Sequence, residues 1–469
     1  MDILLIYPAD GLRFFQSMVP LGMLSVGTVV KEAGYQVKLL DLNHYRGNLK
    51  KDLAFWHPRV IGIGGTTPSR MKSYRIAALA KKILPDTTIV YAGVHATFTA
   101  PEVLAKIPAI DYIIMGEGEL SFRELCDALI RTGSDPEKIS GLAFRRGSEV
   151  VQNPSKRIND LSVLPIPDRD LLEGDYHLDM DFINGTAEPI ITSRGCPAMC
   201  NFCSASRMFP GGVRYRPMDQ VGKEIAYLLE RRPFSGLKVF DSTFTAGRDH
   251  VLRFCETVKP FNLKWECEIR ADTVDYELLT TMKDAGCYYV NMGLESSDDD
   301  RLKKIAKGIS TDQALQVMAD CRRLGILVKV FFTFGHPGQT FAQCKQDIRF
   351  IKKHRKSIDF YAVTPGLKVY PGTRLEKEAH DSGFLPPDFS WVTSRPSLKN
   401  LLLLETSNTF ILFQKQLGAL RLLQIVIILL FSGLYSSREF MWRMIKENIK
   451  NLSTNVFNWY KRLSTKVHK

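Results

Sequence analysis

Short apolar segments rich in β-branched residues alternate with segments of helical periodicity along most of the chain, and this alternation restricts its fold to few architectures. In the first 150 residues, helical stretches such as 21–33 and 74–84 separate the strand-like segments. Strands that alternate with helices predict a parallel, doubly wound α/β sheet. We therefore expect residues 1–150 to form one domain. Its five strands are predicted at 3–8, 36–42, 59–65, 88–94 and 109–116.

Three of these predicted strands end in segments of glycine and polar residues, at 64–67, 93–97 and 116–119. In doubly wound sheets, ligands bind beyond the carboxyl ends of the strands. Glycine at such positions lets a large ligand approach the backbone closely. We therefore expect this edge of the sheet to form a ligand site.

A second alternating series follows a proline-containing linker at 151–185. Six β/α units within residues 186–375 favour a partial parallel barrel over a closed barrel of eight units, with functional residues at the carboxyl ends of the strands. The strands are predicted at 189–193, 237–241, 264–269, 288–294, 327–334 and 358–364, and the helices between them at 218–231, 275–285, 312–324 and 341–354.

Three of the nine cysteines, Cys196, Cys200 and Cys203, share one eight-residue loop after the first barrel strand. Three thiolates in such a loop can bind three irons of a cubane cluster and leave the fourth iron to an exchangeable small molecule. A structural zinc ion is the weaker alternative, because it takes four ligands and no second Cys or His pair stands nearby. The other six cysteines are scattered and show no pairing.

The CxxxCxxC spacing, with Phe202 before the last cysteine, resembles the cluster loop of radical S-adenosylmethionine (SAM) enzymes, and the resemblance covers residues 189–375. It implies a 4Fe–4S cluster, SAM bound to the open iron, and a 5′-deoxyadenosyl radical that abstracts hydrogen from a small-molecule substrate. It also implies an electron donor of the flavodoxin or ferredoxin type. The cofactors carry the reactive chemistry, and the protein positions them.

The same resemblance assigns SAM contacts to residues near the ends of the barrel strands. The common Gly-Gly-Glu is absent after the second strand, where residues 241–243 stand instead. For Glu268, Arg270 and Glu295 the alternative is an ordinary ion pair at the barrel rim, and for residues 335–338 it is a plain strand-to-helix turn. We interpret His336 as a structural histidine. The residues assigned to SAM are Phe202, Asp241, Ser242, Glu268, Arg270, Glu295 and Gly335.

A doubly wound domain before such a barrel is similar to the cobalamin-binding subclass, and the similarity lies in residues 20–41, 92–104 and 115–125. A response-regulator or nucleotide domain is the alternative, but no GxGxxG phosphate motif is present. Leu12 stands where related proteins carry a cobalt-binding histidine, and His44 is spaced one residue too far, so we predict no histidine ligand to cobalt. The implied cobalamin contacts are Thr66, Thr67, Gly93, His95, Ala96, Glu117 and Gly118.

The basic charge of the chain is concentrated in the helical tail expected at 376–469. Residues 395–469 contribute +9 of the formal net charge of +13, and the nearly neutral remainder argues against nucleic-acid binding. An uncharged run at 422–437 is short for a membrane span, and a basic amphipathic stripe with aromatic residues follows it. We expect the tail to lie on a membrane surface, and packing on the barrel is the alternative.

The chain starts without a basic segment or cleavage site, which predicts a cytoplasmic protein attached peripherally or monotopically to the inner face of the membrane. The predicted function is that of a cobalamin-dependent radical SAM enzyme that methylates an unactivated carbon of a lipid-like or tetrapyrrole substrate. An oxidative cyclase or rearrangement enzyme without methyl transfer is the first alternative. A non-catalytic cobalamin and iron–sulfur sensor is the alternative from another class.

Overall fold

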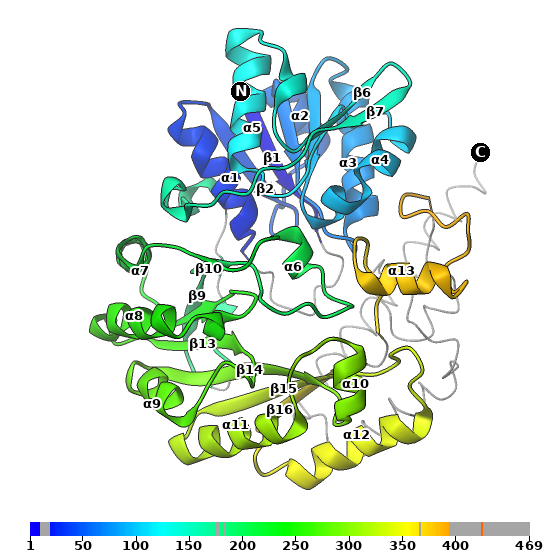
Figure 1. Cartoon of the computed structure of the whole chain (residues 1–469). Coiled ribbons are helices and arrows are strands. Elements are labelled where there is room, and N and C mark those ends of the chain that lie inside the picture. Colours follow the sequence, from blue (N-terminus) through cyan, green and yellow to red (C-terminus); the bar gives the residue numbers. More distant parts are fainter. Residues whose placement is uncertain are drawn as a thin grey trace, which may run out of the picture.

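The computed structural model describes residues 1–393 except 10–18, 174, 175, 177, 182, 365 and 366, together with Gln424. Two α/β units lie one above the other, and a segment that follows the second unit runs back toward the first (Figure 1). The tail predicted to contact a membrane lies almost entirely outside the described residues. Within them, no helix combines the length and the apolar character that a membrane crossing needs.

The first unit is the expected doubly wound sheet. The strand order is β2-β1-β3-β4-β5-β6-β7, and the first five strands pair in parallel. The parallel strands are β1 (Ile3–Tyr7), β2 (Val37–Asp41), β3 (Val60–Ile63), β4 (Thr88–Ala92) and β5 (Tyr112–Ile114). An antiparallel hairpin, β6 (Leu142–Arg146) and β7 (Glu149–Gln152), extends one edge and was not predicted.

Both faces of this sheet are covered, as a parallel sheet requires. In β1, Ile3 and Leu5 pack into one hydrophobic cluster, whereas Leu4 and Ile6 pack into another on the opposite face. The helices are α1 (Leu21–Glu32) and α5 (Glu119–Cys126) on the first face and α2 (Leu49–Trp56), α3 (Arg70–Ile83) and α4 (Val94–Lys106) on the second.

The linker packs on the first unit, because Leu171, Leu172 and Tyr176 join its core and Leu161 lies against Val29. Its short strand β8 (Leu178–Asp179) pairs antiparallel with the edge of the second sheet.

The second unit is the expected partial barrel. Six parallel strands form an open sheet in the order β16-β15-β14-β13-β12-β9, with β8 at the far edge. They are β9 (Thr186–Ile190), β12 (Gly236–Val239), β13 (Lys264–Ile269), β14 (Cys287–Glu295), β15 (Leu327–Thr333) and β16 (Phe360–Thr364). The main helices are α7 (Met218–Arg231), α8 (Arg248–Val258), α9 (Tyr276–Asp284), α11 (Thr311–Leu324) and α12 (Phe341–His354).

Smaller elements follow the barrel strands. They are β10 (Ser193–Arg194), α6 (Ala205–Met208), β11 (Arg214–Tyr215), and α10 (Asp299–Lys304). Of these, β10 and α6 lie between the two units (Figure 1). The barrel residues Ile191 and Phe240 pack against the core of the first unit, so the two units share apolar contact.

The segment after the barrel forms a strap, residues 367–393, which includes α13 (Arg374–Asp381). Trp391 N donates to Glu102 Oε2 at 3.1 Å, and Arg70 Nε donates to Trp391 O at 2.8 Å. Val392 enters the core of the first unit. Residues 376–393, which the sequence analysis assigned to the tail, therefore belong to the body of the protein.

Candidate functional site

The three clustered cysteines lie in the loop between β10 and α6, and all three are free and half-buried. Cys196 Sγ lies 3.3 Å from Thr243 Oγ1. Burial raises the pKa of Cys200 and Cys203, and the charge of Lys307 acts in the opposite direction on both thiols. Burial outweighs this cation, so the pKa of each thiol stays above its ordinary value, and Lys307 only reduces the cost of forming the thiolates that bind metal.

The number of these thiols fits a cubane cluster better than a structural zinc ion. A structural zinc ion takes four protein ligands, whereas three thiolates leave the fourth iron of a cubane cluster open. In the described part of the chain, no group of three or more His, Cys, Asp or Glu side chains is placed to hold a single metal ion.

Asp241, assigned to SAM from the sequence, instead supports the strand that leads into the cluster loop. Its fully buried carboxylate accepts hydrogen bonds from Thr192 N, Thr192 Oγ1 and Ser193 Oγ, each at 2.6 Å. Burial raises its pKa, against these hydrogen bonds. The adjacent Ser242 is exposed and stays a predicted SAM contact.

Glu295 and Arg270 meet around a lysine that the sequence analysis did not single out. Lys307 Nζ lies 3.1 Å from Glu295 Oε1, and Thr333 Oγ1 donates to Glu295 Oε2 at 2.7 Å. Arg270 donates to Asp272 and, at 2.8 Å, to Lys307 O. Glu295 has a φ of +71°, a conformation that costs free energy in a non-glycine residue and is typical of functional sites. Lys307 stands in no sequence motif, so its place in the site follows only from the residues that lie near it in the folded structure.

Glu268 lies on the face of β13 opposite Cys267, which packs in the helix-covered core, so it points to the barrel interior. Burial raises the pKa of Glu268 to about 8, although Lys329 and Lys307 act to lower it. The side chain therefore holds its proton at neutral pH and can donate a hydrogen bond there.

Gly335 and Phe202 meet in one region beside the cluster loop. Gly335 has a φ of +82°, and its N–H donates to Gln339 Oε1 at 2.8 Å. The ring of His336 is buried and lies edge-on to Phe202 with a centroid distance of 6.0 Å. Burial lowers the pKa of His336 to about 4, so the ring is neutral at pH 7. Both ring nitrogens are buried without a hydrogen-bond partner among the described residues, unlike those of a structural histidine whose hydrogen bonds are satisfied. Phe202 also packs against the strap.

The side chains assigned to cobalamin mostly hold the loops of the first sheet together. His95 is fully buried, and its two nitrogens lie 3.0 Å from Tyr74 Oη and 3.1 Å from Thr67 Oγ1. Burial lowers the pKa of His95 to about 3. Thr66 pairs with Ser69, and Ala96 is fully buried. These side chains hold the loops of the edge together, and their contact with cobalamin stays a prediction.

Glycines shape the backbone of the same edge. Gly93 has a φ of +107°, and a Cβ there would lie 2.6 Å from Gly65 O, so glycine lets the two loops approach each other closely. At the start of α1, no described atom lies within 4 Å of the position that a Cβ of Gly22 would take. Gly118 follows in the next loop, and Glu117 beside it is paired with arginines of the barrel unit. The cobalamin contacts assigned to Gly93 and Gly118 stay predictions.

His44 follows the carboxyl end of the edge strand β2, whereas the residues assigned to cobalamin follow β3, β4 and β5. Its ring packs on Tyr176 with a centroid distance of 4.3 Å, and Tyr176 Oη donates to Asp41 Oδ2 at 3.0 Å. Leu12 lies outside the described residues. The absence of a histidine ligand to cobalt stays a prediction.

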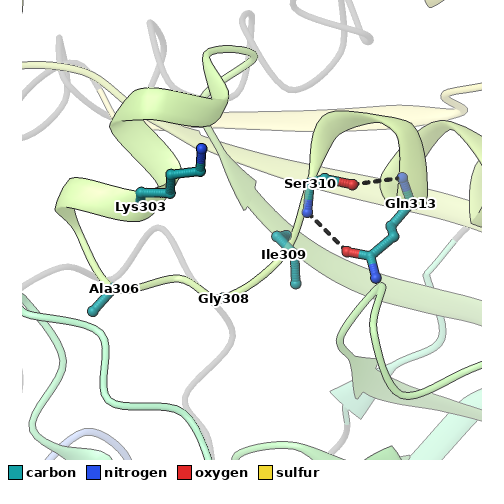
Figure 2. A pocket seen from close by; sticks show the side chains of 6 residues that line it. All are labelled: Lys303, Ala306, Gly308, Ile309, Ser310 and Gln313. Atoms are coloured by element: carbon teal, nitrogen blue, oxygen red, sulfur yellow. Dashed lines mark hydrogen bonds between the residues drawn. The ribbon is translucent and has the colours of Figure 1, made fainter.

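A pocket of about 690 Å³ lies beside the loop between α10 and α11 (Figure 2). Ser310 and Gln313 line it, but each side chain already bonds to the other residue's backbone in a capping box. None of the predicted site residues lines the pocket. We therefore do not assign it to the site.

Comparison with known proteins agrees with this arrangement. The model of the radical SAM superfamily matches residues 190–351, and that of the B12 binding domain matches residues 10–126. An uncharacterized methyltransferase of Pyrococcus horikoshii is 31% identical over 368 residues, which are 76% of this chain and 77% of the relative. An anaerobic magnesium-protoporphyrin IX monomethyl ester cyclase of Synechocystis sp. is 30% identical over 335 residues, which are 68% of this chain and 66% of that protein.

The fold is shared with a solved structure. The radical SAM methyltransferase TsrM from Kitasatospora setae, with cobalamin and a 4Fe–4S cluster bound, superposes with a TM-score of 0.68 at 18% identity. The match covers 85% of this chain and 77% of TsrM.

Proposed function

Since the chain belongs to the cobalamin-binding subclass of the radical SAM superfamily, we propose that it methylates an unactivated carbon atom of a lipid-like or tetrapyrrole molecule. Its cofactors are a 4Fe–4S cluster, SAM and cobalamin. One observation carries the proposal: buried ion pairs join the cobalamin-binding edge to the strand that leads into the cysteine loop. Methyl transfer to a carbon radical needs both cofactors at one substrate.

The site residues have different roles in the proposed reaction. Bound at this site, the cluster with SAM supplies a radical and cobalamin supplies a methyl group. Cys196, Cys200 and Cys203 would hold the cluster. Phe202 packs between the 335–338 turn and the strap and shields the loop from water. Glu268 would hold its proton toward the barrel interior.

An oxidative cyclisation or rearrangement is the second candidate, and the similarity to a tetrapyrrole cyclase favours it. The same cofactors serve both reactions, so the product decides between them. The lipid alternative rests on the membrane contact proposed for the tail. A flavodoxin-type or ferredoxin-type protein is the proposed electron donor, and the cytoplasmic face of the membrane is the proposed location.

Anaerobic reconstitution with SAM that carries a deuterated methyl group tests the proposal. We expect 5′-deoxyadenosine to form and a component of a membrane extract to gain the labelled methyl group, as measured by mass spectrometry. A product that is dehydrogenated or cyclised without label would support the cyclase instead. Absence of 5′-deoxyadenosine from reduced, cluster-loaded protein would support a sensor.

The cluster assignment is tested by Cys200→Ala. Loss of one of three protein ligands should abolish the cluster absorbance and 5′-deoxyadenosine formation, because the loop contains no fourth cysteine that could replace it. Cys126→Ala is the matched control, since that thiol is buried in the core of the first unit. Unchanged 5′-deoxyadenosine formation by Cys200→Ala would contradict the assignment.

A further inference from the structure

Two carboxylates of the cobalamin-binding unit and two arginines of the barrel unit form one buried cluster between the units. Arg194 Nη1 lies 2.8 Å from Glu117 Oε1, and Arg214 Nη1 lies 2.6 Å from Glu117 Oε2. Arg194 also pairs with Glu119. The exposed fraction is 17% for the Arg194 side chain and at most 5% for the other three. We call these four residues the interdomain charge cluster.

The geometry of the cluster is specific rather than incidental. Arg194 and Arg214 are register partners in the β10–β11 pair, so both guanidinium groups approach the same loop. Ser25 Oγ donates to Glu119 Oε1 at 2.9 Å, and Ile158 N donates to Glu117 Oε2 at 3.0 Å. The formal charges cancel. These hydrogen bonds help to offset the desolvation of the buried charges, although Nε and Nη2 of Arg214 have no partner among the described residues. Loss of one member of the cluster would leave an unpaired buried charge.

The cluster connects the two segments that hold the cofactors. Arg194 precedes the ligand Cys196 by two residues, and Asp241 holds the neighbouring Ser193 from the barrel side. Glu117 stands between Gly116 and Gly118, in the loop at the cobalamin-binding edge. These ion pairs therefore restrain the movement of one segment relative to the other.

We propose that Glu117 is a positioning residue, which acts through Arg194 and Arg214 to fix the distance between the cobalamin-binding edge and the cluster loop. The sequence analysis had assigned Glu117 to cobalamin contact, but its carboxylate oxygens are both occupied by the barrel unit. The inference rests on the proposed function only in that both cofactors act on one substrate. In such reactions a displacement of about 1 Å can cost roughly 100-fold in rate.

Other contacts keep the units together when this cluster is changed. The strap bonds to Glu102 and Arg70 of the first unit, and Ile191 and Phe240 pack on its core. Glu117→Gln should therefore shift the two cofactors relative to each other without separating the units.

The test uses the full chain loaded with the cluster and cobalamin. Electron paramagnetic resonance measures the magnetic interaction between cob(II)alamin and the reduced cluster, which falls steeply with distance and needs no substrate. We expect Glu117→Gln and Arg194→Gln to change this interaction alike, and the double variant to add little, because the four residues act as a unit. Iron content and cobalamin affinity should stay at the level of the unchanged protein.

Glu137→Gln is the matched control, because Glu137 pairs with Arg146 inside the first unit and should leave the interaction unchanged. Glu117→Asp keeps the charge and should give a smaller change in the same direction, which carries the test if Glu117→Gln does not fold. Two results would overturn the inference: an unchanged interaction in both variants, or loss of cobalamin affinity in Glu117→Gln alone. Neither result depends on methyl transfer. Failure of the inference about Glu117 can therefore be distinguished from failure of the proposed function.

Discussion

Glu268 is the residue whose ionisation is most open to measurement. Burial raises its pKa from 4.5 to about 8, so the folded cofactor-free protein binds a proton that the unfolded chain has lost. Between pH 4.5 and 8 the unfolded chain therefore binds fewer protons here than the folded chain, and this carboxyl group lowers stability as pH rises through that window.

Glu268→Gln should remove this dependence. We expect the variant and the unchanged protein to have similar unfolding free energies near pH 5. Near pH 8 the variant should be more stable by at least about 1 kcal/mol, the equivalent of roughly one pKa unit. Urea unfolding at the two pH values measures the difference. Equal pH dependence in both proteins would show that Glu268 titrates normally.

At the scale of elements, the positions of helices and strands were largely predictable, because local signals define them. Helix α12 has the predicted bounds, and a capping box between Thr340 and Gln343 marks its start. The β6–β7 hairpin was not predicted, because it is short and antiparallel and does not continue the alternation of strands and helices. The strap was missed because its contacts are long-range: Trp391 meets Glu102, far away in the sequence.

In the candidate site, too, local patterns predict positions but not contacts. Motif spacing predicted the cluster loop, and strand ends predicted Asp241, Glu268 and Glu295 as site residues. Which partner each carboxylate meets depends on tertiary contacts that no local pattern encodes. Asp241 accepts three hydrogen bonds from Thr192 and Ser193, and Glu117 meets arginines of another unit. Only the structure gives these contacts, and the roles of the site residues toward the cofactors stay predictions.

The strap is an element whose contribution to stability can be measured directly. Trp391 is buried, its indole N–H donates to Glu376, and its backbone bonds to both Glu102 and Arg70. Trp391→Ala should lower the free energy of unfolding by about 3–5 kcal/mol through loss of packing. Phe55→Ala is the control, because Phe55 is 81% exposed and should change stability by less than about 0.5 kcal/mol. Equal effects in denaturant unfolding would show that the strap is not packed as described.

At the scale of the whole molecule, most of the basic charge follows the described body of the protein. Trp391 and Val392 are the last of the described residues that enter a core. The +9 of residues 395–469 follows them, whereas the residues before position 395 carry only +4. We expect residues 1–393 to fold without the rest, because the described cores are built from them.

This division makes the proposed membrane contact testable by truncation. A chain that ends at residue 393 should keep its cluster and cobalamin but should not float with vesicles that contain anionic lipid. The full chain should float with them and detach as salt rises, because each Lys or Arg near such a surface contributes about 1 kcal/mol that salt screens. Neutral vesicles are the control for purely apolar insertion, which salt would not reverse. Flotation of the truncated chain to the same extent would place membrane contact on the body and contradict its assignment to the tail.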